Sequence, residues 1–93
     1  MIAYILINCT PSGEKDVIAE LSKLPEIVEI NGVLGKYDIF AKVVGKAPGD
    51  IDLVVSKIRS VNGITSSYTM TAVYGQGGTM DKEPNNGVSL LEY

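Results

Sequence analysis

The 93-residue chain contains no histidine, one cysteine and one arginine, and each shortage argues against a class of function. Without histidine, the chain lacks the side chain that most often acts as general base and metal ligand. Cys9 alone cannot form an intrachain disulfide, which is typical of a protein in the reducing cytoplasm. We interpret Cys9 as a small buried hydrophobic residue, because no histidine can activate its thiol.

Positive charge is also scarce, with 8 basic and 11 acidic residues and a net charge of −3. The lysines are scattered and form no basic stripe, so we expect no direct contact with nucleic acid. No apolar run approaches the ~20 residues of a membrane span, so we expect no membrane partner. The metal-binding, redox and phosphate-loop motifs CxxC, HExxH and GxxxxGK[ST] are missing, so we expect no metal, no cofactor and no catalytic residues.

What the chain does contain is a regular series of apolar segments separated by Gly, Pro and Asn, and 45% of its residues are hydrophobic. Their periodicity predicts strands over residues 2–9, 27–30, 37–44 and 64–74, and helices over 14–24 and 51–61. The order β-α-β-β-α-β predicts an α+β, ferredoxin-like fold: a four-stranded antiparallel sheet with two helices on one face.

Three residues are predicted to mark helix ends. Ser12 is expected to cap the first helix, and Asp50 to cap the second from the position before it. Gly63 is expected to adopt a left-handed conformation where the second helix stops.

The predicted sheet has two apolar faces, although two helices can cover only one of them. Both alternating sets of the first strand are apolar: Ile2, Tyr4 and Leu6 on one side, and Ala3, Ile5 and Ile7 on the other. The simplest cover for the second face is another copy of the chain, packed sheet to sheet about a two-fold axis. The alternative is that the C-terminal tail folds back over it.

The GVLGKYD segment, residues 32–38, is the best candidate for a ligand site. Gly32 and Gly35 allow backbone conformations that can aim several N–H and C=O groups at one point, as a zwitterion requires. Asp38 could hold an ammonium group. The alternative is a plain loop in which Asp38 fastens its own backbone. In the last strand, Thr65, Ser67, Thr69 and Thr71 place hydroxyls on one face.

Three segments resemble one family: LxxLPEIVE at residues 21–29, GxxGKYD at 32–38 and VNGITSSYTMTAV at 61–73. They are similar to the RAM domain, the effector-binding domain of the leucine-responsive and asparagine regulators, the Lrp/AsnC family. The resemblance covers residues 1–75, which we take as the effector-binding domain, with residues 76–93 as a C-terminal tail. It implies a dimeric α+β barrel, assembly of dimers into octamer-like rings, and an amino-acid effector held between dimers.

The site residues that the resemblance implies are the GxYD turn of one subunit and hydroxyls of the last strand: Gly32, Val33, Leu34, Gly35, Lys36, Tyr37, Asp38, Ser67 and Thr69. Full-length members carry a helix-turn-helix domain before this one, whereas this sequence starts at the first strand. It therefore resembles stand-alone RAM proteins, which are expected to sense an amino acid or to co-assemble with full-length regulators.

Two other functions remain compatible with the sequence. One is a small dimeric α+β barrel enzyme, such as a monooxygenase or isomerase, because fold does not determine function. The missing histidine argues against it. The other is a protein-interaction module that binds no small ligand and recruits its partner through exposed strand edges or the apolar VSLLEY end, residues 88–93.

Overall fold

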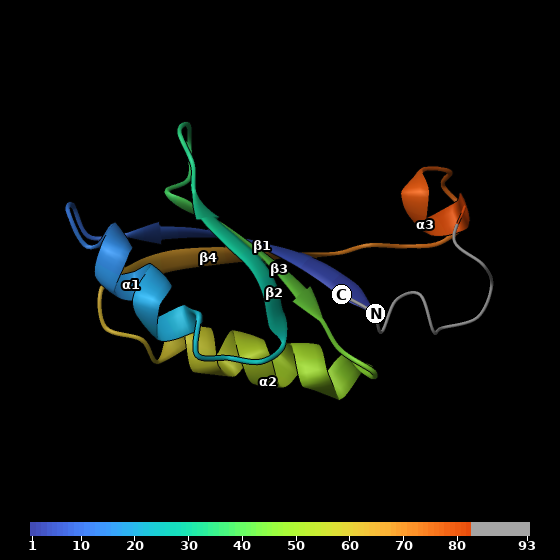
Figure 1. Cartoon of the computed structure of the whole chain (residues 1–93), viewed down its shortest axis with the longest axis horizontal. Helices are drawn as coiled ribbons and strands as arrows, with labels where there is room; N and C mark the ends of the chain where they lie inside the picture. Colours follow the sequence, from blue (N-terminus) through green and yellow to red (C-terminus); the bar gives the residue numbers. More distant parts are fainter. Residues whose placement is uncertain (83–93) are drawn as a thin grey trace.

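The four strands form one antiparallel sheet in the order β2-β3-β1-β4, as the predicted ferredoxin-like fold requires. The computed structural model describes residues 1–82 (Figure 1). Its elements are β1 (Ile2–Cys9), α1 (Glu14–Leu21), β2 (Ile27–Gly32), β3 (Ile39–Val44), α2 (Pro48–Arg59), β4 (Ile64–Thr71) and the short α3 (Thr79–Lys82). The predicted α+β fold is confirmed.

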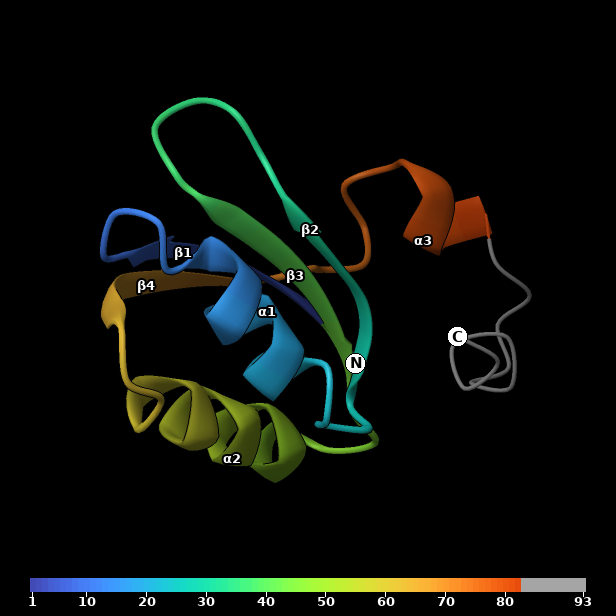
Figure 2. The same cartoon turned by 60° about the vertical axis from the view of Figure 1, so that its left-hand side comes forward.

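The hydrophobic core lies between the helices and one face of the sheet. Figure 2 shows α1 lying over the sheet with α2 beside it. The buried residues of this core include Ala3, Ile5 and Ile7 of β1, Ile39, Ala41 and Val43 of β3, Val17 and Leu21 of α1, and Val54 and Ile58 of α2. Each fully buried Val, Leu or Ile contributes about 1.5–3 kcal/mol relative to an exposed one, so this face carries much of the stability.

The start of α1 differs from the prediction. Ser12 does not cap the helix: it has a left-handed φ of 66°, and the N-cap position belongs to Gly13, which provides no side-chain cap. The turn closes instead through the backbone, because Gly13 N–H donates to Thr10 O at 2.9 Å. The prediction was wrong because the chain makes a tight turn after β1 and Ser12 lies within that turn.

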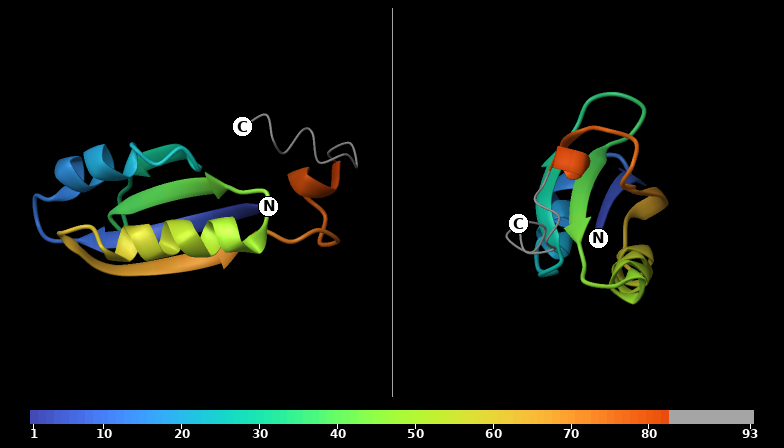
Figure 3. Two further views of the ribbon diagram at one scale, coloured as in Figure 1. Left: turned by 90° about the horizontal axis from the view of Figure 1, so that it is seen from below. Right: turned by 90° about the vertical axis from the view of Figure 1, so that its right-hand side faces the viewer.

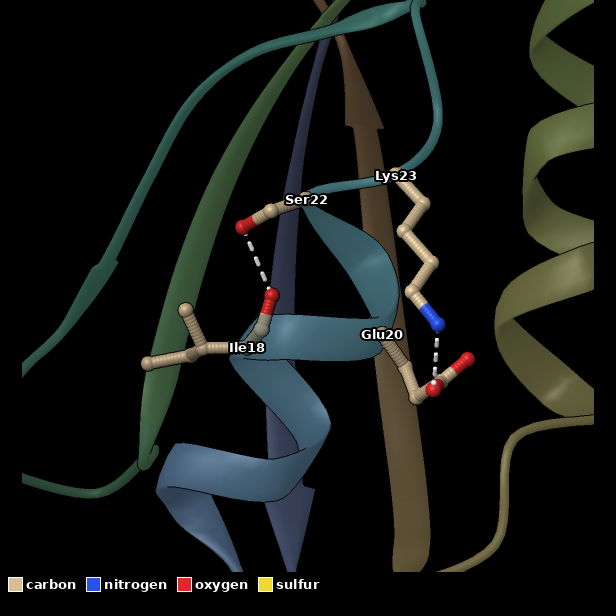
Figure 4. A network of polar contacts seen from close by, with 4 residues as sticks. All are labelled: Ile18, Glu20, Ser22 and Lys23. Carbon is tan, nitrogen blue, oxygen red and sulfur yellow. Dashed lines mark hydrogen bonds and ion pairs between the residues drawn. The ribbon is translucent and has the colours of Figure 1, made fainter.

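The end of α1 is closed by Ser22 and Lys23 (Figure 4). The Ser22 hydroxyl donates to Ile18 O at 2.7 Å, and this carbonyl also accepts the Ser22 backbone N–H at 2.9 Å. Lys23 forms a 2.9 Å salt bridge with Glu20, in which both side chains are more than half exposed. Such an exposed pair adds little stability, so the backbone bonds and Pro25 decide where the helix stops.

The second helix begins two residues before the predicted cap. Asp50 lies inside α2 rather than before it, and its Oδ2 accepts hydrogen bonds from Lys46 N–H at 2.8 Å and Ala47 N–H at 3.1 Å. Pro48 fits the first turn, where its missing N–H leaves no bond unmade. Gly63 has the expected left-handed φ of 96°, but it lies in the turn before β4, four residues after the helix ends.

The helix-free face of the sheet has an apolar region over β1, β3 and β4, as predicted, with Lys42 beside Tyr4 and with Glu29 and Asn31 along β2. Pairing of β1 with β3 and β4 brings together Tyr4 and Leu6 of β1, Phe40 and Val44 of β3, and Tyr68 and Met70 of β4. The rings of Tyr4 and Phe40 stack with centroids 5.9 Å apart. Tyr68 and Met70 remain 57% and 40% exposed, so neither helix covers this face.

The segment after β4 leaves the sheet. Strand pairing stops at Thr71 rather than at the predicted Tyr74, and α3 lies beyond the end of the sheet that is opposite α1 (Figure 3). Asp81 accepts hydrogen bonds from the N–H groups of Gly75 and Gly77. The predicted docking segment at residues 88–93 lies outside the described residues. Within residues 1–82, no helix is long and apolar enough to cross a membrane.

Candidate functional site

The GVLGKYD segment forms the tip of the hairpin between β2 and β3. The pairing of the two strands continues one step further, because Val33 N–H donates to Asp38 O at 2.9 Å. Beyond that bond the chain rises away from the rest of the molecule (Figure 2). Leu34 is fully exposed, and Gly35 has a φ of 140°, a conformation that residues with a side chain rarely adopt. The backbone of residues 34–37 is thus presented to a partner or ligand.

Asp38 anchors this tip to the central strand. Its Oδ2 accepts a hydrogen bond from Cys9 N–H at 2.9 Å, and its own N–H donates to Ile7 O at 3.0 Å. The carboxylate therefore fastens β1, a neighbouring strand, rather than its own turn as the plain-loop alternative assumed. The same carboxylate also bonds to the Cys9 thiol, and because each carboxylate oxygen has two lone pairs it can still accept a hydrogen bond from a ligand.

Cys9 lies beside this anchor and is chemically quiet. The side chain is 8% exposed. Burial raises the pKa of the Cys9 thiol above its ordinary value, and the nearby carboxylates of Glu14 and Asp38 raise it further. A neutral thiol is a poor nucleophile, so the geometry agrees with a packing role for Cys9.

Ser67 and Thr69 do not join the hairpin tip within one chain. Ser67 pairs with Ile7 and Thr69 with Ile5, which places both hydroxyl-bearing residues on the helix side of β4, half-buried. Because β1 lies between β4 and β3, Ser67 is two strand spacings, about 10 Å, from the start of β3. The structure thus keeps the two halves of the predicted site apart.

Hollows open on the surface of the described residues, and one of them includes a predicted site residue. A hollow of about 310 Å³ is lined by Arg59, Ile64, Thr65, Ser66 and Ser67. A second, of about 260 Å³, lies at the start of α2 and includes Glu26, Lys46 and Asp50. The third, of about 520 Å³, includes Asp16, Glu20 and Ser60. Arg59 and Ser66 were not predicted as site residues, since no local motif links the end of a helix to the next strand.

Metal binding is not suggested by the arrangement of ligand side chains. Among residues 1–82, no three Cys, Asp or Glu side chains are grouped as a metal ion would require. The site offers backbone amides, hydroxyls, one guanidinium and one half-used carboxylate, which suit a small polar ligand bound without chemistry.

Comparison with known proteins identifies the family of this domain. The family model described as the Lrp/AsnC ligand binding domain matches residues 2–74. The chain belongs to the Lrp/AsnC family. A curated relative, the HTH-type transcriptional regulator FL11 of Pyrococcus horikoshii, is 31% identical over 70 residues, which are 75% of this chain and 46% of the regulator. The chain spans about half the length of the Lrp/AsnC regulators that it matches.

Solved structures of the same family have the same fold. The crystal structure of FFRP-DM1 is 33% identical, covers 77% of this chain and 97% of its own, and superposes with a TM-score of 0.73. Together with the regulator relatives, this Lrp/AsnC likeness supports a regulatory, ligand-sensing module.

One relative of the Lrp/AsnC chain is an enzyme. Homocitrate synthase of Sulfurisphaera tokodaii is 36% identical over 68 residues, which are 72% of this chain but only 15% of the enzyme. A shared segment that small does not transfer the activity of the whole enzyme. The regulator relatives instead favour a non-catalytic role.

Proposed function

We propose that the chain binds a free amino acid and changes its assembly in response. The observation that carries the proposal is the hairpin tip of residues 34–37 in a domain whose family is defined by ligand binding. The tip presents open backbone groups and is held in place by the Asp38–Cys9 bond. Backbone N–H groups suit a carboxylate, and backbone carbonyls with Asp38 Oδ1 suit an ammonium group.

The separation of the two half-sites supports a ligand position between copies. One small ligand cannot easily contact both the hairpin tip and the hydroxyls of Ser67 and Thr69 across β1 in one chain. It can contact both if the tip belongs to one copy and β4 to another. A ligand bound in this way stabilises the assembly that forms the pocket, by mass action.

The proposed dimer rests on the apolar face of the sheet, and the proposed ring and co-assembly rest on membership of the Lrp/AsnC family. We propose a homodimer through the helix-free face, assembly of dimers into an octamer-like ring, and co-assembly with full-length regulators of the family. In a mixed assembly, an amino acid bound by this chain would alter the state of the DNA-binding subunits without this domain contacting DNA itself. The net charge of −3 agrees with a domain that does not itself bind DNA.

Titration calorimetry against the twenty common amino acids tests the proposal, with the oligomeric state measured by analytical ultracentrifugation with and without each one. We expect binding of at least one amino acid at or below millimolar concentration, and a shift in the distribution of oligomers when it binds. Absence of heat with all twenty, from a chain that remains assembled, would contradict the proposal. If deletion of residues 76–93 then left the assembly intact but abolished binding of a protein partner, the protein-interaction module would be favoured.

A further inference from the structure

The hollow at the start of β4 differs in charge from the other two. Its lining residues are Arg59, Ile64, Thr65, Ser66 and Ser67, which are one basic residue and three hydroxyl-bearing residues with no acidic residue among them. The hollow at the start of α2 contains Glu26 and Asp50 beside Lys46, and the third contains Asp16 and Glu20 without a cation. In a chain with a net charge of −3, the β4 hollow is the one suited to an anion.

The polar groups of the β4 hollow are available to a ligand. Among the described residues, the Arg59 guanidinium and the hydroxyls of Thr65 and Ser67 make no hydrogen bond or ion pair. Ser66 Oγ instead accepts a bond of 3.4 Å from Asn8 Nδ2, its partner on β1, so its side chain lies on the opposite face of β4 from Ser67. A guanidinium has five N–H donors in a planar fork that matches the two oxygens of a carboxylate.

The hollow also lies at the same end of the sheet as the hairpin anchor. Cys9 pairs with Ile64, which lines the hollow, and its N–H donates to Asp38 on the other side of β1. The end of β1 therefore lies between the hollow that contains Arg59 and the carboxylate of Asp38. In an assembly, a zwitterion seated in the hollow would turn its ammonium group away from Arg59, toward the hairpin tip of another copy.

We propose that Arg59, with the hydroxyls of Thr65 and Ser67, binds the α-carboxylate of the amino-acid ligand. This assignment rests on the proposed function and adds the group that is recognised on the ligand. The volume of about 310 Å³ is at the lower end of the range for small-molecule sites, so a free amino acid fits the class of ligand. The proposal assigns Arg59 a role in ligand binding. The alternative is a local role, in which its positive charge compensates the helix dipole at the end of α2.

The test combines a protein variant with a ligand variant. The probes are L-leucine and its α-amide L-leucinamide, or the same pair for whichever amino acid binds most tightly to the wild type. Arg59→Gln should weaken binding of the amino acid roughly ten- to a hundredfold, the value of a charged hydrogen bond. The amide should bind the wild type weakly, because it lacks the carboxylate that Arg59 holds. For the same reason, Arg59→Gln should reduce the affinity for the amide by little.

Lys57→Gln is the matched control, since it removes one positive charge from the same last turn of α2 but does not line the hollow. It should leave affinity unchanged, and thermal unfolding should confirm that both variants fold. Equal amino-acid affinity in wild type and Arg59→Gln would overturn this assignment while leaving the proposed function in place. Equal losses in both variants would also overturn it, because they would indicate a general effect of charge. Absence of amino-acid binding in the wild type would overturn both proposals.

Discussion

At the scale of single residues, Asp38 has two separable roles. One carboxylate oxygen completes the backbone bonding of β1, because that strand runs two residues past its last pair with β3, which joins Ile7 to Ile39. A backbone N–H left without a partner at this partly buried position would cost free energy. The carboxylate also bonds to the Cys9 thiol and keeps lone pairs that can accept a hydrogen bond from a ligand. The same side chain therefore stabilises the hairpin and contributes charge to the proposed site.

Replacing Asp38 should separate these roles. Asp38→Ala removes the acceptor for Cys9 N–H and should lower the free energy of unfolding by roughly 1–3 kcal/mol, measured by urea denaturation. Asp38→Asn keeps an oxygen acceptor and should lose less than half as much, but it removes the charge offered to an ammonium group. We therefore expect weaker amino-acid binding in a nearly normal fold. An Ala variant as stable as the wild type would show that the bond to Cys9 contributes nothing.

At the scale of elements, the ends of helices and strands depend on their neighbours. The last strand was predicted to reach Tyr74, but the strand that it pairs with, β1, begins at Ile2, and the last bond joins Ala72 N–H to Ile2 O. The residues just beyond have good strand composition, but within residues 1–82 no strand lies beside them. Likewise, α2 starts early because the Asp50 carboxylate satisfies two amides that precede it.

The start of α2 depends on a glycine that approaches it closely. A Cβ on Gly45 would lie 2.7 Å from Asp50 Cβ, so Gly45→Ala must displace the residue that caps the helix. We expect a loss of roughly 1–3 kcal/mol in the free energy of unfolding, from overpacking and a weakened cap.

Gly49→Ala is the matched control, because nothing lies within 4 Å of its Cβ and it sits in the first turn of the same helix. It should be neutral or more stable than the wild type, since alanine is the better helix former. Equal stability of the two variants would mean that the contact at Gly45 relaxes without cost.

At the scale of the whole molecule, the sheet is covered on one side and open on the other. Contiguous apolar surface of several hundred Å² is rare on monomers and marks an interaction site. Tyr4, Leu6 and Phe40 lie in the middle of this face next to Lys42, and Tyr68 and Met70 extend its apolar part over the edge strand β4. This is the surface that we propose to pack against a second copy.

A charge on this face should break the dimer. Tyr68 is 57% exposed in the single chain, so Tyr68→Glu should leave the fold intact while placing an unpaired charge in the interface. Light scattering should then give a mass no more than half that of the wild-type assembly. Leu53→Glu, on the outer side of α2 and 51% exposed, should not change the mass. A wild-type protein that is already monomeric in dilute solution would contradict the proposed interface.

The sequence by itself determined the order of elements and the direction of side chains in the central strands. Alternation along residues 2–9 and 39–44 is sufficient for this, because the period of a strand is two residues whatever surrounds it. It also made the GVLGKYD segment stand out, since glycine spacing and an aspartate are visible without coordinates.

The tertiary structure alone decided which groups meet. Asp38 bonds to Cys9, 29 residues away, and Arg59 shares a hollow with Ser67 because α2 packs beside β4. A local sequence pattern does not show which backbone N–H lacks a ladder partner when two paired strands differ in length. Nor does it show which strand lies next to the end of a helix. Those pairings are set by strand order and register, and these follow from burying the whole core at once.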